Sequence, residues 1–516
     1  MERFIAQFAD LIIGTLSGFD RLVFRGHLRR IIYPAGMTLF LNVRQILFRD
    51  FRAFMRKTTE QLQQVVEATA RNQGRPVRYL ESPKADKEAI AREIARKDDL
   101  RQGLIALLTC VEPCRTFGLG SNPKTGALEI RSKSGKCLHH YYYVIDPVFG
   151  FMNARIQTWF PFSIQICING REWLARQMDH AGLTYERRDN CFVQISDFAQ
   201  AQRLMARQLR ASWPGLLDRI ARMLNPVHDD IFQDFAVNYY WSVYQSEWAS
   251  DIVFRNAAAL QSIYPTLTHH AITTFGSGDV MRFLGGKVNG AFRGEIISEF
   301  KDRPEGVRVK HWVDKNSIKL YDKKASVLRP ETTINDPGGI KVFRPKEGEP
   351  WGDKEWRPLR KGIADLHRRA QVSHAANDRY LDALAAVNLS SSLGDLLRKV
   401  CRPARHNGKR VRGLRPWSPD EIALFEAIHR GEFCINGLRN RDLQRLLYAT
   451  PPSDAKDQRR RSARISYLLR ILRVHGILHK IPKTHRYKVS SNGRDILTAV
   501  LAAHRAPVAS ISKLAA

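Results

Sequence analysis

The sequence predicts an α+β protein of several domains, with an antiparallel-sheet core, a helical N-terminal region and a small C-terminal unit. Two observations favour this class. Segments that alternate between polar and apolar residues follow one another at hairpin spacing, and stretches of helical periodicity separate them. The chain has 516 residues, 44% of them hydrophobic, which is enough for about two to four domains.

Residues 1–105 are expected to be mainly helical. Apolar residues recur at helical spacing between positions 40 and 54, and the segment 84–101 has the composition of a second, charged helix. Asp10 and Asp20 flank the short apolar run at 11–16, so this end does not have the form of a secretory signal peptide.

Residues 106–225 form a first predicted α+β unit. Strand patterns alternate with two helical patterns, and the second and third strands are close enough to pair. The expected strands are 138–146, 151–157, 163–168 and 184–195, and the expected helices are 172–181 and 198–209.

Residues 226–345 form a second predicted α+β unit. A long strand at 239–254 and a helix at 257–264 precede an expected meander of four short strands, at 295–300, 307–313, 317–322 and 327–335. Residues 346–415 are then expected to be a basic linker that contains a helix at 366–384.

Residues 416–516 give the clearest local pattern. Ser418 and Pro419 are a helix start, with a hydroxyl N-cap and proline in the first turn. A second helix begins near residue 440, and a very basic third helix covers 458–475. Two short strands follow at 477–481 and 486–489, before a last helix. This segment resembles the winged-helix domains of small bacterial transcription regulators.

The resemblance implies nucleic-acid binding by the third helix and the strand pair. A helix that is basic at its N-terminal end and apolar behind can anchor in a core and present arginines to a groove, while the wing reaches phosphates or a minor groove. The alternative is a winged helix that contacts protein, with a solvated basic face. The predicted contacts are Arg459, Arg460, Arg461, Arg464, Lys480, Lys483, His485, Arg486 and Lys488.

The charge of the whole chain supports a polyanionic partner. There are 83 Lys and Arg against 51 Asp and Glu, a formal net charge of +32, and residues 401–516 account for only half of this excess. A surface outside the C-terminal unit is therefore expected to contact nucleic acid too, with DNA favoured and RNA possible in principle. Nothing in the chain indicates a membrane partner.

A hairpin at 319–333 is the candidate for catalysis. Alternation places Lys319 and Tyr321 on one face of the first strand, and Arg329 and Glu331 on one face of the second. A tyrosine nucleophile beside a lysine, with a carboxylate for Mg²⁺ or Mn²⁺, suits DNA nicking through a phosphotyrosine. This short stretch resembles strands of plasmid and phage rolling-circle initiators.

The chain departs from that family in one respect. Many rolling-circle enzymes bind their metal through a His-x-His strand, and no His-x-His occurs among the 16 histidines. Other carboxylates would have to supply ligands. The alternative is a basic hairpin that grips a nucleic-acid backbone without cutting it. The candidate carboxylates are Glu295, Glu299, Asp302, Glu305 and Asp322.

Seven cysteines bear on metals and on the compartment. Cys110, Cys114, Cys137 and His139 offer four soft ligands for a possible tetrahedral Zn²⁺ site, although ordinary core or surface cysteines are the alternative. A sparse, odd number of cysteines fits a reducing cytoplasm.

Two further features of the sequence bear on nucleic-acid binding. The aromatic run at 141–143 and the aromatics at 149–162 lie near arginines, so they either stack unpaired bases or fill a core. From Phe19 onward, and through 168–174 and 309–335, the chain also resembles a family of uncharacterised bacterial proteins from genomes rich in mobile elements. That resemblance implies nucleic-acid handling without naming an activity.

Overall fold

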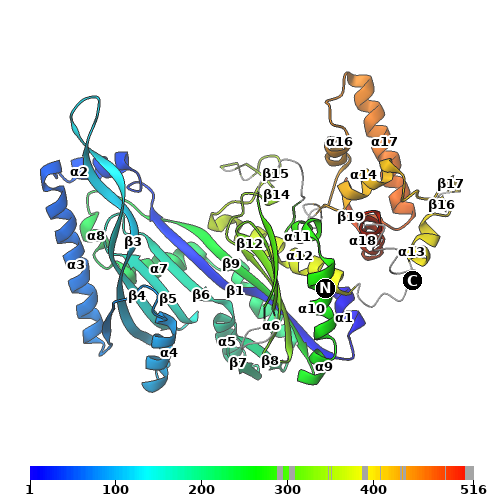
Figure 1. Ribbon diagram of the computed structural model, residues 1–516. Helices are drawn as coiled ribbons and strands as arrows, with labels where there is room; N and C mark the ends of the chain where they lie inside the picture. Colours follow the sequence, from blue (N-terminus) through cyan, green and yellow to red (C-terminus); the bar gives the residue numbers. More distant parts are fainter. Residues whose placement is uncertain are drawn as a thin grey trace.

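One long sheet organises the α+β fold that the sequence predicts. The computed structural model describes residues 1–286, 294–301, 308–346, 348–349, 351–385, 393–406, 408–430, 433, 437–482 and 484–505. Its eleven-stranded sheet has the order β10-β11-β12-β13-β9-β1-β6-β5-β4-β3-β2 (Figure 1). All neighbours are antiparallel except β2 and β3. The bounds are β1 (Ile12–Leu28), β2 (Val77–Leu80), β3 (Gly103–Ser121), β4 (Leu128–Asp146), β5 (Gly150–Gln157), β6 (Ile164–Asn169), β9 (Tyr239–Phe254), β10 (Ile296–Lys301), β11 (Arg308–Val313), β12 (Asn316–Lys323) and β13 (Val327–Ile334).

The N-terminal region contains four helices, as expected, but also the central strand β1, which was not predicted. Much of β1 is buried, so its apolar residues run on without clear alternation, and the sequence pattern is ambiguous. The helices of this region are α1 (Glu2–Gln7), α2 (Pro34–Val43), α3 (Phe51–Asn72) and α4 (Lys87–Lys97). Since β1 pairs with β6 on one side and β9 on the other, the two predicted α+β units share one sheet.

Helices cover one face of this sheet. Apolar side chains of α2, α3 and α7 (Trp213–Leu224) pack in one core with Leu22 and Phe24 of β1. In a second core, α10 (Tyr264–Thr274), α11 (Ser277–Phe283) and α12 (Leu366–Ala385) pack on Ile318, Leu320 and Leu328 of the meander. The remaining elements are α5 (Gly170–His180), α6 (Phe198–Ala206), α8 (His228–Ile231), α9 (Ala257–Gln261), α13 (Leu393–Val400), η1 (Phe48–Asp50), η2 (Arg207–Arg210), η3 (Ile363–Asp365), β14 (Lys341–Arg344), β15 (Glu355–Pro358), β16 (Ala404–His406) and β17 (Lys409–Val411).

The opposite face is covered in part. Helix α6 lies over the first half of β1, where Phe198 and Met205 face Gly14 and Gly18. Helix α4 packs on β3 and β4, and the hairpin of β7 (Tyr185–Arg188) and β8 (Cys191–Ile195) packs on β9 and β13. A single strand at 184–195 was predicted; the chain instead turns at Asp189, which has a φ of 54°. Between α4 and this hairpin, polar side chains of β6, β1, β9, β12 and β11 are half-buried or exposed. We call this region the open face.

The C-terminal unit lies at one end of the molecule (Figure 1). It comprises α14 (Pro419–Ile428), α16 (Asn440–Leu447), α17 (Ala455–Val474), β18 (Leu478–Lys480), β19 (Tyr487–Val489) and α18 (Ser491–Arg505). It has its own apolar core. An ion pair from Arg3 to Asp495 joins it to the N-terminal helix, and a cavity of about 680 Å³ lies between the two parts. No helix of the described residues is long and apolar enough to cross a membrane.

Candidate functional site

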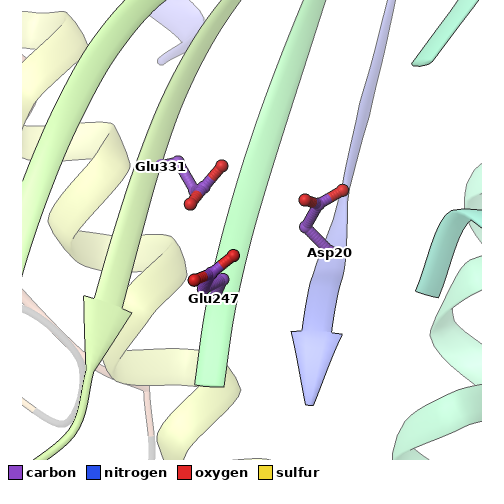
Figure 2. A group of neighbouring side chains, drawn as sticks. All are labelled: Asp20, Glu247 and Glu331. Atoms are coloured by element: carbon purple, nitrogen blue, oxygen red, sulfur yellow. The ribbon is translucent and has the colours of Figure 1, made fainter. Parts of the chain in front are cut away.

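Three carboxylates converge on the open face of the sheet. Asp20, Glu247 and Glu331 come from the neighbouring strands β1, β9 and β13, and each offers an oxygen within 4.8 Å of the others (Figure 2). The register explains the meeting, because Glu247 lies opposite Arg21 on one side and Thr333 on the other. A bulge between Phe19 and Arg21 leaves Asp20 free to turn to this face. We call these three residues the carboxylate cluster.

Two buried arginines flank the carboxylate cluster. Arg329 Nη1 lies 3.3 Å from Asp20 Oδ1, and its Nη2 donates to Asp251 Oδ2 at 2.9 Å. Arg171, in the first turn of α5, donates to the same Oδ2 of Asp251 at 3.0 Å and lies 3.8 Å from Asp20. Both guanidinium groups are almost fully buried. Charges buried at this depth need partners, so the arginines and aspartates fix one another and the strands that carry them.

The three members of the carboxylate cluster have shifted pKa values. Burial raises the pKa of Glu247 to about 7, and the nearby charge of Glu331 adds to this effect. Burial also raises the pKa of Asp20, against the pull of Arg329. Burial acts in the same direction on Glu331, but Lys319, the charge of Arg329 and the hydrogen bond from Tyr321 together outweigh it and hold the pKa of Glu331 below its usual value. A divalent cation would relieve this crowding, because it favours the ionised carboxylates.

The predicted catalytic residues lie together at this place. Lys319 is paired with Glu331 across the hairpin of β12 and β13, and its Nζ lies 2.8 Å from Glu331 Oε1. The Tyr321 hydroxyl donates to Glu331 Oε2 at 2.8 Å. Burial and the charge of Glu331 raise the pKa of Tyr321 well above its usual value. The tyrosine is therefore held protonated, with an acceptor for its proton in contact.

The other two carboxylates of the cluster were missed in the sequence. Asp20 and Glu247 are far apart in the chain and from Glu331, and only the strand order brings them together. An acid inside an otherwise apolar strand was the available signal, because a buried charge requires partners. The hairpin 319–333 alone could not identify them.

The carboxylates proposed from the sequence do not join the cluster where the structure describes them. Glu299 is paired with Arg308 at 2.8 Å. Asp322 accepts from Gln261 at 2.8 Å on the helix-covered face, so it points away from the cluster. Glu295 precedes β10 and is separated from the cluster by the meander. Asp302 and Glu305 lie outside the described residues.

The predicted zinc ligands lie near one another on β3 and β4, and Cys114 contacts Cys137, but the four do not converge on one point. Cys110 lies opposite His139 in the pairing of β3 and β4, whereas Cys114 lies opposite Gly135. Cys137 Sγ is 4.0 Å from His139 Nδ1. Within the described part of the chain, the carboxylate cluster is the one group of three or more such ligands that meets within 4.8 Å. The four residues do not form such a group in this structure, and the zinc site stays a prediction.

The predicted arginines of α17 fall into two groups. Arg459, Arg460 and Arg464 are exposed; Arg460 pairs with Asp457 and Arg464 with Asp420. Arg461 turns inward, where it contacts Asp457, the carbonyl of Thr450 and the ring of Tyr448. The last half of the helix contributes Ile465, Leu469 and Leu472 to the core of the unit.

The predicted wing residues also differ in position. Lys480 and His485 are exposed, and Lys488 is half-buried beside the cavity between the C-terminal unit and the core. Arg486 is only 7% exposed and lies over the ring of Phe343 at 3.8 Å, with its Nη1 donating to Gly437. It therefore stabilises the unit and is not available as a contact. Lys483 lies outside the described residues.

The aromatic run at 141–143 does not form a stacking platform. All three tyrosines are buried, in the cores on the two faces of β4. Phe149, Phe160 and Phe162 are buried as well. The aromatic run therefore fills cores, which was the alternative prediction. Because β4 is covered on both faces, its side chains are buried whichever way they point.

No family model, no curated protein and no solved structure matches this chain. What the protein does must therefore be inferred from its own geometry and charge.

Proposed function

We propose that residues 416–505 form a winged helix that binds nucleic acid, DNA in the first instance. The observation that carries the proposal is the division of α17, whose first turns present Arg459, Arg460 and Arg464 to solvent while its later residues fill a core. A helix of this kind can enter a groove without losing its anchor.

The order of elements supports the same proposal. Among the described residues, α14, α16 and α17 are followed by the hairpin of β18 and β19 and then by α18. A single β-bridge between Leu438 and Tyr487, with reciprocal N–H···O bonds of 2.8 and 2.9 Å, ties the segment before α16 to the hairpin. The net charge of +32 gives the long-range attraction that nucleic acid requires.

Binding of labelled duplex DNA at several salt concentrations tests this proposal. In the triple variant Arg459→Ala/Arg460→Ala/Arg464→Ala, we expect weaker binding and a salt slope reduced by about 2 to 3, since each phosphate contact contributes about 0.9. The matched control is Arg49→Ala/Arg71→Ala/Arg101→Ala, which removes the same charge from side chains that are 80%, 68% and 84% exposed. Equal affinity and slope in the two variants would contradict the proposal.

A second candidate function is metal-dependent cleavage of a phosphodiester bond at the carboxylate cluster. The specific observation in its favour is that Tyr321 and Lys319 meet three carboxylates at one place on the sheet. Oxygen ligands of this kind suit Mg²⁺ or Mn²⁺. Asp20, Glu247 and Glu331 would hold the ion, which would polarise a phosphoryl oxygen.

The tyrosine allows a transesterification. Its hydroxyl oxygen would attack phosphorus and form a phosphotyrosine bond, while the bond from phosphorus to one sugar oxygen breaks. The phenolic proton would pass to Glu331, which already accepts it in a hydrogen bond, and the leaving sugar oxygen would take a proton from water.

Incubation with supercoiled plasmid and Mg²⁺ or Mn²⁺ tests this candidate. We expect nicking by the wild type, a protein–DNA adduct that survives denaturation, and loss of both in Tyr321→Phe and Glu331→Gln. Tyr185→Phe, a surface tyrosine bonded to Asp179, is the control. If no nicking occurs while duplex binding is tight, the protein is a binding protein and this candidate fails.

A further inference from the structure

The open face has exposed aromatic side chains that no core explains. Tyr240 and Tyr244 of β9 are 37% and 47% exposed, on the side of the sheet away from the helices. Trp312 of β11 is half-buried on the same face. Directly paired residues of neighbouring strands point to one face, and Trp312 pairs with Ser317, Ser317 with Thr333 and Thr333 with Glu247. Aromatic rings left at the surface of a sheet commonly contact a ligand.

Each of these rings has a cation against it. The Arg25 guanidinium lies 4.0 Å from the centroid of Tyr244, that of Arg29 lies 4.2 Å from Tyr240, and Lys310 Nζ lies 4.4 Å from Trp312. Within the described part of the chain, none of these three cations has a carboxylate within 4.0 Å. Several arginines elsewhere on the core surface, by contrast, are paired with acids. The open face therefore presents positive charge that the protein does not neutralise.

This surface leads to the carboxylate cluster. Tyr240, Tyr244 and Glu247 lie on one strand, and seven residues at 3.3 Å each place the first about 23 Å from the last. Arg25 and Asp20 both lie on the next strand, β1. A cavity of about 200 Å³ opens beside the cluster, lined by Arg21, Arg92, Asn153 and Asn169 together with Asp20 and Glu247. Polar groups line the way from the rings to the acids.

We propose that the open face binds an unpaired strand of nucleic acid and leads its backbone to the carboxylate cluster. Phosphates contact Arg25, Arg29 and Lys310, and bases stack on Tyr240 and Tyr244. This inference rests on the proposed function, because it takes nucleic acid as the partner, but it assigns a second surface and a different form of nucleic acid to it.

Single strands fit these residues better than a duplex does. Base faces are free to stack on aromatic rings only when the strand is unpaired, and each such stack contributes strongly to affinity. A duplex offers phosphates alone to a flat sheet, so the tyrosines would add nothing. An acidic protein segment would satisfy the cations but would also leave the paired rings without a role.

Fluorescence anisotropy with the full chain tests the proposal, using a labelled single strand of mixed sequence and the blunt duplex of the same sequence. We expect Tyr240→Ala/Tyr244→Ala to weaken single-strand binding by at least about fivefold, the smallest effect typical of one lost stack, and to leave duplex binding within twofold. Tyr33→Ala/Tyr79→Ala is the matched control, since these tyrosines are 69% and 56% exposed and lie elsewhere. Equal thermal midpoints of the two variants exclude unfolding as the cause.

The outcomes separate this inference from the proposed function. If single-strand affinity is unchanged in Tyr240→Ala/Tyr244→Ala but falls in Arg459→Ala/Arg460→Ala/Arg464→Ala, the strand binds at the C-terminal unit and the inference is wrong. If the wild type binds neither form, the proposed function is wrong as well. If Tyr240→Ala/Tyr244→Ala weakens duplex and single-strand binding by the same factor, the inference is also wrong, because base stacking would then not explain the loss of affinity.

Discussion

At the scale of single residues, most of the charged side chains at the centre of the sheet have an oppositely charged partner, but one carboxylate does not. Arg171 and Arg329 neutralise Asp251 and Asp20, and Lys319 neutralises Glu331. Glu247 has no such strong partner, because burial and the charge of Glu331 raise its pKa more than Lys319 and Arg21 lower it. Its carboxyl group is therefore the member of the carboxylate cluster that responds to pH near neutrality.

Glu247 should make stability depend on pH. Its pKa is raised to about 7 in the folded protein, so its protonated form stabilises the fold below about pH 4.5, and this contribution is lost as the pH rises through 7. One pKa unit corresponds to about 1.4 kcal/mol, and partial exposure of the side chain reduces the total to about 1–2 kcal/mol. Glu247→Gln should therefore equal the wild type in stability to urea at pH 4 and exceed it at pH 8.

Addition of Mg²⁺ distinguishes a metal site from a purely structural cluster. If the cluster binds the ion, 10 mM Mg²⁺ should narrow the gap between wild type and Glu247→Gln at pH 8, because binding to the folded state adds stability. An unchanged gap would argue against the second candidate function.

At the scale of elements, the sequence predicts what has a strong local pattern. Strand β9 was predicted at 239–254 and has those bounds, and the meander and the C-terminal helices lie within a few residues of their predicted positions. The errors occur where a tertiary contact overrides the pattern. The helical spacing at 40–54 is broken after α2, where Gln45 has a φ of 54°.

The candidate site was predictable only in part, for a related reason. Lys319, Tyr321 and Glu331 lie on one hairpin, so local alternation is enough to place them together. Asp20 and Glu247 enter through pairings of β1 with β9 and of β9 with β13. Pairing between distant strands leaves no local signature, so the sequence indicates neither partner.

The start of α5 should be intolerant of a methyl group. A Cβ on Gly170 would lie 1.7 Å from the backbone oxygen of Phe19, so either α5 or β1 must move, next to both Arg171 and Asp20. Gly170→Ala should cost about 3 kcal/mol or more and lower the thermal midpoint by several degrees.

Gly215→Ala is the control for this effect. It lies in α7, and its added Cβ would meet only Ser212 Oγ at 3.7 Å, so it should be neutral or stabilise by up to about 1 kcal/mol. If the thermal midpoints of Gly170→Ala and Gly215→Ala are equal, α5 is not tightly held against β1.

At the scale of the whole molecule, two basic surfaces on one chain should cooperate. The C-terminal unit lies at one end and the sheet with its open face beside it (Figure 1). A duplex with a single-stranded arm can occupy both surfaces at once, and the second contact is then intramolecular. We expect such a substrate to bind at least about tenfold more tightly than the duplex or the strand alone.

The length of the arm is the variable to change. Affinity should rise once the arm spans the distance between the surfaces, and Tyr240→Ala/Tyr244→Ala should remove the gain while leaving the duplex contribution. A competition assay against unlabelled duplex measures both. An advantage that survives in the tyrosine variant would mean that the arm is held elsewhere.

The position of β1 has a consequence for synthesis of the chain. Its strand is complete at residue 28, but its neighbours are β6 at 164–169 and β9 at 239–254. At about 5–20 residues per second, the ribosome needs roughly 10 to 50 seconds to make the residues between β1 and the end of β9. Throughout this interval an apolar strand edge stays without its final partner, so the nascent chain should depend on chaperones more than its native stability would suggest.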